Sequence, residues 1–316
     1  MTASQRPHLD VGALSHEGEK RENNEDSYAV AAYRLKKSSK PTTLAVVADG
    51  IGGHQAGEVA SQITVESIVE ALTNADGEDP IPQIHDAIST AGTLVAETSF
   101  RSSDFYGMGS TVAVAWVIEE KLYTANVGDS RIYLSRNSSI RQITVDHTWV
   151  QEAIDLEIID PSEARNHPHA HMLQKAIGSP DPPEPDFRLR LSDDEDDEQS
   201  EGNQGLILRS GDIVLLCSDG LTDLVSDQEI QTAINEQAPN EAVQSLVSLA
   251  RARGGHDNIT IVILSVPVNW KLTKHERRRR VFLIGLIVIL LIALIIAITF
   301  LGGWLFGVIP WPLGAP

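Results

Sequence analysis

The feature that most constrains the fold of this 316-residue chain is an Asp-Gly pair that follows a run of apolar residues, and it occurs twice. The run LAVVAD precedes Gly50, and the run IVLLCSD precedes Gly220. Asp-Gly is most often the turn of a β-hairpin. Apolar residues nevertheless recur at helical spacing after Gly50. After Gly220, Ser226 precedes two acidic residues, a pattern typical of a helix N-cap and first turn. We therefore expect two buried strands, each ending in a carboxylate at a strand-to-helix corner.

Two further aspartates lie beside predicted strands. Asp129 is separated from the end of one strand-like run by a single glycine, and Asp257 lies two residues before the start of another. With Asp49 and Asp219 they make four carboxylates at strand ends. Mg²⁺ and Mn²⁺ prefer oxygen ligands held on a rigid frame. The sequence therefore predicts a site for a hard divalent cation.

The order of the predicted elements indicates an α+β fold. Strands with tight connections between them, as in an antiparallel meander, are predicted at 112–118, 122–127 and 131–134. Helices are predicted at 57–72, 83–99, 226–235 and 239–252. Strands, then helices, then strands again are typical of antiparallel sheets whose faces are covered by helices.

The charge is distributed unevenly along the chain. Residues 1–270 carry 19 basic and 43 acidic residues, a net charge of −24, whereas residues 271–316 carry six basic residues and one acidic residue. Such an acidic domain repels phosphate backbones, so we expect no nucleic-acid partner. Cys217 is the single cysteine, which excludes a disulfide within one chain.

Segment 281–301 contains 21 residues without a charge and is rich in Ile and Leu, enough to cross a bilayer as a helix. A buried core helix is the alternative, but such helices are rarely this long and apolar all round. The basic segment 271–280 precedes it and no Lys or Arg follows, so the positive-inside rule places residues 1–270 in the cytoplasm. We expect a single-pass cell-membrane protein with a short extracytoplasmic tail, 302–316, and a basic segment suited to anionic lipid.

Two stretches of the N-terminal domain differ from the rest. Segment 146–180 is polar and rich in His and Pro, and we expect short helices that form a flap near the site. Loop 192–205 contains SDDEDDEQSE, which has seven acids in ten positions and no apolar residue. Such a composition predicts a solvated, disordered loop between two strands.

Six motifs follow one another along the chain: KRENNEDSY (20–28), VVADGIGGHQAGEVAS (46–61), GMGST (107–111), NVGDSRIY (126–133), CSDGL (217–221) and GGHDNITIV (254–262). In this order they resemble the metal-dependent protein phosphatases, the PPM or protein phosphatase type 2C family, in its bacterial serine/threonine form. The resemblance covers about residues 8–267. It implies a central antiparallel β-sandwich flanked by helices on both sides, to which the C-terminal transmembrane helix is added.

The resemblance also implies a reaction and its metal ligands. The expected activity is hydrolysis of phosphoserine and phosphothreonine in proteins by a water activated between two divalent ions, Mn²⁺ or Mg²⁺. Asp49 matches the acid that bridges the ions, and Gly50 matches a residue that binds one ion through its carbonyl. Asp219 and Asp257 match the ligands of the other ion. Asp129 matches an acid that helps to bind a third ion in bacterial relatives, although an aspartate here also suits a turn cap.

Arg21 matches the phosphate-binding arginine of the family, and its planar fork suits two phosphoryl oxygens. Glu25 and Asp26 match an acidic pair that reaches the ions through water. On composition alone this segment would be ordinary charged surface. Some members carry a histidine, a proposed general acid, directly after the first Asp-Gly. In this chain Ile51 occupies that position, so we assign no such role to His54. We also assign no chemistry to the flap histidines His147, His167, His169 and His171.

By the same resemblance the partners are phosphoproteins and a cognate serine/threonine kinase. Two alternatives stay open at this stage. One is a metal-dependent phosphoesterase with a small-molecule substrate, and the other is a catalytically silent, membrane-anchored module that binds phosphoproteins. The acid set is complete, which argues against the silent module.

Overall fold

The computed structural model describes residues 2–3, 8–52, 56–164, 167–179 and 184–268. The chain divides into one unit from Met1 to Val268 and a second from Asn269 to Pro316. The predicted basic segment, membrane helix and tail belong to the second unit and lie outside the described residues. Within the described ranges, no helix is long and apolar enough to cross a membrane.

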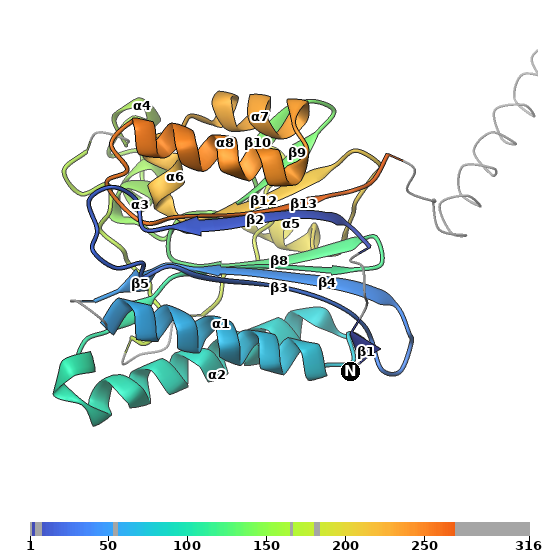
Figure 1. The fold of residues 1–316 in the computed structure, drawn as a ribbon, viewed down its shortest axis with the longest axis horizontal. Coiled ribbons are helices and arrows are strands. Elements are labelled where there is room, and N and C mark those ends of the chain that lie inside the picture. The colour runs from blue at the N-terminus through green and yellow to red at the C-terminus, as the bar shows by residue number, and fades with distance from the viewer. Residues whose placement is uncertain (1, 4–7, 53–55, 165–166, 180–183, 269–316) are drawn as a thin grey trace, which may run out of the picture. The chain divides into compact units, whose positions relative to one another are not determined.

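Two antiparallel sheets stack face to face in the first unit (Figure 1). The six-stranded sheet has the order β1 (Thr2–Ala3), β3 (Ser27–Arg34), β4 (Pro41–Ala48), β7 (Val112–Ile118), β8 (Lys121–Val127) and β11 (Leu206–Ile207). The five-stranded sheet has the order β10 (Ser139–Gln142), β9 (Arg131–Arg136), β12 (Ile213–Cys217), β13 (Ile259–Ser265) and β2 (Asp10–His16). A small third sheet pairs β5 (Gly50–Ile51) with β6 (Gly109–Ser110).

Helices cover the outer faces of both large sheets (Figure 1). On the first sheet lie α1 (Ala56–Asn74) and α2 (Pro80–Arg101), and Ile68 and Leu72 of α1 share a core with Leu44 and Trp116. On the second lie α7 (Asp227–Glu236) and α8 (Pro239–Ala252), with Leu246 in a core with Leu215. The four helices predicted from periodicity are thus confirmed to within three residues at each end.

The central strands are buried along almost their whole length because both of their faces are covered. All seven residues of β7 are buried, and in β4 every residue after Pro41 is buried. Strands buried on both faces read as continuous apolar runs and not as alternating patterns. The predicted α+β fold, with an antiparallel sandwich between helices, is confirmed for the described unit.

The flap is built as expected from short helices, α3 (Trp149–Asp155) and α4 (Pro161–Ala164). Its two ends are tied together by a β-bridge between Thr148 and Leu173. A second bridge joins Ile177 to Ser110, at the end of β6. The flap therefore starts and returns beside the strands that carry the acidic residues.

The prediction of a disordered acidic loop is wrong. The stretch contains a short helix, α5 (Asp197–Gly202), which begins with a capping box between Asp196 and Gln199. Ser200, within this helix, is fully buried. Two arginines from elsewhere neutralise part of the charge, in the ion pairs Arg141–Asp193 and Arg188–Asp197. Helix capping and these pairs supply the order that apolar residues do not.

Candidate metal centre

The predicted acidic residues meet at one end of the sandwich. In the first sheet β4 ends directly before Asp49, and its neighbour β3 begins directly after Asp26. In the second sheet β12 ends two residues before Asp219, and β13 begins two residues after Asp257. Asp129 lies in the connection between β8 and β9. Because antiparallel neighbours end and begin at the same edge, carboxylates far apart in sequence converge.

The carboxylates are close enough to perturb one another. The pKa of Asp49 is raised well above its ordinary value, first by burial and then by the charges of Asp26, Asp219, Asp129 and Asp257. Burial likewise raises the pKa of Asp129, with Asp219 as the next cause. Burial raises the pKa of Asp26 to about 7, against a hydrogen bond from Ser218 that lowers it. Acids crowded in this way need a compensating cation in order to be ionised together.

Two carboxylate oxygens test whether these residues fit a metal. Oδ1 of Asp26 and Oδ1 of Asp219 are buried, and neither accepts a hydrogen bond from the described part of the chain. The other oxygen of Asp26 accepts a hydrogen bond from the Ser218 hydroxyl at 2.7 Å. A buried oxygen without a donor is costly, and a hard cation satisfies it. The donor set therefore fits Mn²⁺ or Mg²⁺.

Both Asp-Gly pairs need glycine because another backbone segment approaches closely. A Cβ on Gly50 would lie 2.1 Å from the carbonyl oxygen of Gly57. A Cβ on Gly220 would lie 2.0 Å from the carbonyl oxygen of Asn258. Neither distance is sterically allowed, so close packing and not a hairpin turn explains the glycines.

The two corners differ from each other. The second corner matches the prediction, because α6 (Asp219–Thr222) begins at Asp219 itself. At the first corner the short strand β5 comes between Asp49 and α1, and the sequence analysis did not predict it. Its two residues are too few to show a periodic pattern. The strand pairs with β6 and so brings the GMGST motif alongside Asp49.

Thr111 holds the backbone of Asp49 from both sides, a role that the sequence analysis did not predict. Its hydroxyl accepts a hydrogen bond from the Asp49 N–H at 2.9 Å, and its own N–H donates to the Asp49 carbonyl at 2.8 Å. The same hydroxyl is hydrogen-bonded to the hydroxyl of Ser130 at 2.6 Å. Thr111 thereby connects Asp49 with the residue next to Asp129. The only signal in the sequence is a hydroxyl residue directly before an apolar strand.

Asn258 ties the N-terminal acidic segment to Asp257, and this role was also missed. Its side-chain oxygen accepts a hydrogen bond from the Glu25 N–H at 2.7 Å. Its side-chain nitrogen donates to the carbonyls of Glu17 and Asn23, each at 3.0 Å. Asn258 is 2% exposed, so these bonds are shielded from water. It fixes the loop that carries Arg21, Glu25 and Asp26.

Arg21 lies beside a predicted metal ligand. Its Nη2 donates to Oδ2 of Asp257 at 2.6 Å, and its side chain is 51% exposed. This hydrogen bond raises the pKa of Arg21. Glu25 accepts the N–H of Gly50 with its carbonyl at 3.1 Å, which places it against the first corner. Both residues therefore border the acidic site, where their match to the family motif had led us to expect them.

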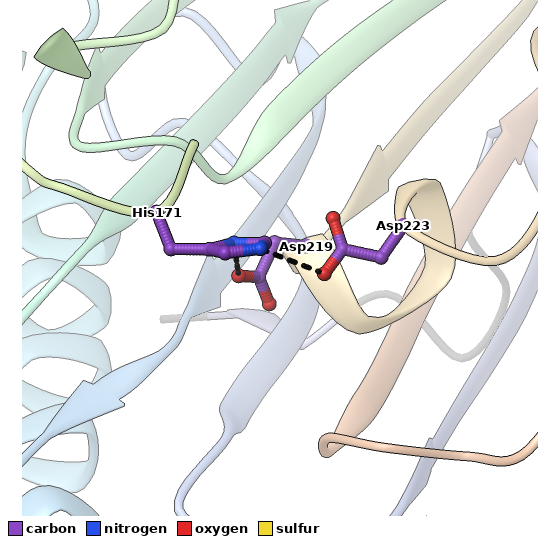
Figure 2. Close-up of side chains that lie close together, drawn as sticks. All are labelled: His171, Asp219 and Asp223. Atoms are coloured by element: carbon purple, nitrogen blue, oxygen red, sulfur yellow. Dashed lines mark ion pairs between the residues drawn. The ribbon is translucent and has the colours of Figure 1, made fainter. Parts of the chain in front are cut away.

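The flap brings a histidine to the site, which the sequence analysis did not foresee. His171 Nδ1 lies 3.6 Å from Oδ2 of Asp219, and its Nε2 lies 3.7 Å from Oδ2 of Asp223 (Figure 2). The nearby carboxylate of Asp219 is the largest cause that raises the pKa of His171 to about 9. Burial raises the pKa of Asp223 to about 6. One ligand atom from each of the three side chains lies within 4.8 Å of the others, which is close enough for a shared cation.

A cavity of about 460 Å³ opens between the flap and α6. Asp129, Asp219, Asp223 and His171 are among the residues that line it. Arg131 also lines the cavity and is paired with Asp146 through two nitrogens, at 2.9 and 2.7 Å. Asp129 therefore faces the same space as Asp219, which favours an ion site over a turn cap.

The other described histidines of the flap make contacts away from the acidic residues of the site. His147 Nδ1 accepts a hydrogen bond from the Gly128 N–H at 3.1 Å, and its Nε2 lies 3.1 Å from Oδ2 of the buried Asp186. The rings of His167 and His169 pack against Trp149. His54 lies outside the described residues.

Known proteins resemble this chain over most of the described unit. The family model described as protein phosphatase 2C matches residues 15–252. The serine/threonine protein phosphatase PstP of Mycobacterium tuberculosis (strain CDC 1551 / Oshkosh) is 34% identical over 258 residues, which cover 82% of this chain and 45% of PstP. The protein phosphatase PhpP of Streptococcus pneumoniae serotype 2 (strain D39 / NCTC 7466) is 30% identical over 262 residues, which cover 82% of this chain and 98% of PhpP.

A solved structure shares the fold. It is the catalytic domain of the serine/threonine protein phosphatase PstP in complex with two manganese ions, with a TM-score of 0.67 and 33% sequence identity. The match covers 81% of this chain and 97% of that one. The chain thus spans nearly all of the PstP catalytic domain but less than half of the PstP protein.

Proposed function

Because this chain belongs to the protein phosphatase 2C family, we propose that it is a metal-dependent phosphatase that removes phosphate from serine and threonine side chains of proteins. One observation carries the proposal. Five aspartates converge beside a half-exposed arginine at one end of the sandwich, and a buried oxygen of two of them, Asp26 and Asp219, has no donor in the described part of the chain. This combination suits two divalent cations and a phosphoryl group.

We assign the predicted metal positions to the residues that converge there. Asp49 would hold both ions, either Mn²⁺ or Mg²⁺, and the Gly50 carbonyl, Asp219 and Asp257 would complete the set of ligands. The two manganese ions in the PstP structure support this assignment. When bound, such ions act as Lewis acids and activate water at neutral pH. A third ion would be held by Asp129 and Asp219.

The chain's own residues bind and orient the substrate around these ions. Among the described residues Arg21 donates a side-chain hydrogen bond to Asp257 alone, which leaves guanidinium N–H groups to hold phosphoryl oxygens. The Ser218 hydroxyl donates to Asp26, and Asn258 accepts the backbone N–H of Glu25, so both acids are held at the edge of the site, from which they would reach the ions through water. Cys217 is fully buried in β12 and burial raises its pKa, so it is not a nucleophile.

Phosphate release from a phosphothreonine peptide tests the activity. The purified chain with added Mn²⁺ is expected to release phosphate, to stop when a chelator is added, and to resume when Mn²⁺ is restored. Peptide binding without release at any Mn²⁺ concentration would identify a silent binding module instead. Far faster hydrolysis of a small phosphoester than of any phosphopeptide would point to the small-molecule enzyme.

We also propose that the enzyme is anchored in the cell membrane with its catalytic unit in the cytoplasm. The proposal is supported by the 21 uncharged residues of 281–301 and by the basic segment before them. The basic side chains would contact anionic lipid. A serine/threonine kinase that phosphorylates the same substrates is the partner we propose.

Protease treatment of sealed membrane vesicles tests this topology. In inside-out vesicles the acidic catalytic unit should be digested, because the cytoplasmic face of the membrane is then turned towards the protease. In right-side-out vesicles it should survive until detergent is added. Protection in inside-out vesicles, or recovery of the chain in the soluble fraction, would contradict the proposal.

A further inference from the structure

An apolar groove of about 260 Å³ includes Ile51, two residues after Asp49, in its wall and shares no lining residue with the acidic cavity. Its walls come from the end of α2, the segment that joins the 3₁₀ helix η1 (Ser103–Phe105) to β6, the strand β5 and the returning end of the flap. The principal lining side chains are Ile51, Phe100, Tyr106, Met108 and Ile177. None of the described residues that line the groove is charged.

The rim of the groove exposes unusual apolar surface. Tyr106 is 77% exposed and Phe100 is 67% exposed, more than any other large apolar side chain in the described ranges except Val268. The floor is buried, with Met108 at 2% and Ile177 at 1% exposure. Two exposed aromatic rings around a buried apolar floor are typical of a surface that binds a partner's side chain.

The groove is continuous with the residue assigned to bridge the metals. Ile51 follows Asp49 by two residues, so their Cα atoms are at most about 7 Å apart. Ile51 pairs with Gly109, and the next two residues, Ser110 of β6 and Thr111 after it, donate to the Asp49 carbonyl at 2.9 and 2.8 Å. A polypeptide whose phosphorylated residue is at Asp49 therefore has its neighbouring residues within reach of the groove.

We propose that this groove binds an apolar side chain of the substrate, one to three residues from the phosphorylated serine or threonine. The proposal rests on the proposed phosphatase function and specifies its substrate class. The groove is smaller than the 300–1,000 Å³ usual for small-molecule sites, which favours a single side chain as its occupant. Its lack of charge disfavours acidic or basic residues there, because they would lose hydration without gaining a partner.

A set of phosphothreonine peptides tests the proposal with the full chain. Each peptide has an alanine background and carries either Leu or Asp at one position, from three residues before to three residues after the phosphothreonine. At one position we expect kcat/KM to be at least about tenfold higher with Leu than with Asp, mainly through a lower KM. Hydrolysis of p-nitrophenyl phosphate, which has no flanking residue, reports the fraction of competent enzyme in each preparation.

Matched variants connect that preference with the groove. The double variant Phe100→Ala, Tyr106→Ala removes only exposed rings, so it should fold, and its Leu-to-Asp ratio should fall towards one. Leu94→Ala removes a 41% exposed side chain from the same helix outside the groove and should keep the full ratio. A double variant that retains the preference would overturn the proposal.

Other results have distinct meanings. If the unaltered chain hydrolyses p-nitrophenyl phosphate and the alanine peptide but shows no preference at any position, the groove proposal fails and the phosphatase function stands. If it hydrolyses neither substrate, both fail. If light scattering shows that the double variant loses a self-associated form while peptide kinetics are unchanged, the groove is an interface between copies, which also overturns the proposal.

Discussion

Asp49→Asn is expected to lower phosphatase turnover by about a thousandfold or more, since it removes the charge assigned to bridge two cations. The same change should stabilise the metal-free protein, because burial and four other aspartates penalise the Asp49 carboxylate there. The isosteric amide leaves the hydrogen bonds of the Asp49 backbone to Thr111 in place. Phosphate release with Mn²⁺ and thermal unfolding in a chelator measure the two effects.

A matched control separates the site from a general loss of charge. Asp10→Asn changes an exposed carboxylate at the start of β2, the end of that strand away from the metal centre, and should leave turnover and unfolding nearly unchanged. An Asp49→Asn protein with more than a tenth of normal turnover would contradict the bridging role. Lost activity together with lower metal-free stability would show instead that the change damages the fold.

The metal-free protein is expected to lose stability as the pH rises from about 4 to about 8. A carboxyl group whose pKa is raised on folding stabilises the protein fully below its unfolded pKa, and this contribution is lost as the pH passes the folded pKa. For Asp26 this pH window runs from 3.8 to about 7, and across it the free energy of unfolding falls by an amount on the order of 4 kcal/mol. The raised pKa values of Asp49 and Asp129 act in the same direction.

Mn²⁺ should reverse this trend, because the cation compensates the ionised carboxylates. We therefore expect the difference in Tm between the Mn²⁺-loaded and the chelator-treated protein to grow between pH 5 and pH 8. Asp26→Asn should flatten the curve of the metal-free protein over that interval. A metal-free protein that gains stability with pH, or a difference in Tm that shrinks, would show that the carboxylates are not crowded as described.

The backbone of the site could be predicted because its signals are local. Apolar runs identify strands, and Asp49 and Asp219 at the ends of two such runs predict carboxylates at strand ends that suit a metal site. Ser226 was expected to begin a helix, and both its N–H and its hydroxyl donate to Glu229 at the start of α7. These features depend on residues close together in sequence.

The parts that could not be predicted depend on contacts between distant segments. His171 reaches Asp219 from a polar flap without periodicity, so nothing near it in sequence marks its role. Asn258 binds backbone groups more than 230 residues away, at Glu25 and Asn23. The acidic stretch is ordered partly by Arg141, which lies 52 residues before its partner Asp193 and becomes its neighbour only once the sheet has formed. Composition alone contains none of this information.

The role of Asp49 as a shared ligand of two metal ions is tested by equilibrium binding of Mn²⁺ at neutral pH, measured per chain for the unaltered protein and for Asp49→Asn. We expect at least two Mn²⁺ ions per unaltered chain and the loss of tight binding in the variant, because one carboxylate would hold both ions. No Mn²⁺ bound to the unaltered chain, or equal binding to both proteins, would contradict the claim that Asp49 holds a pair of metal ions.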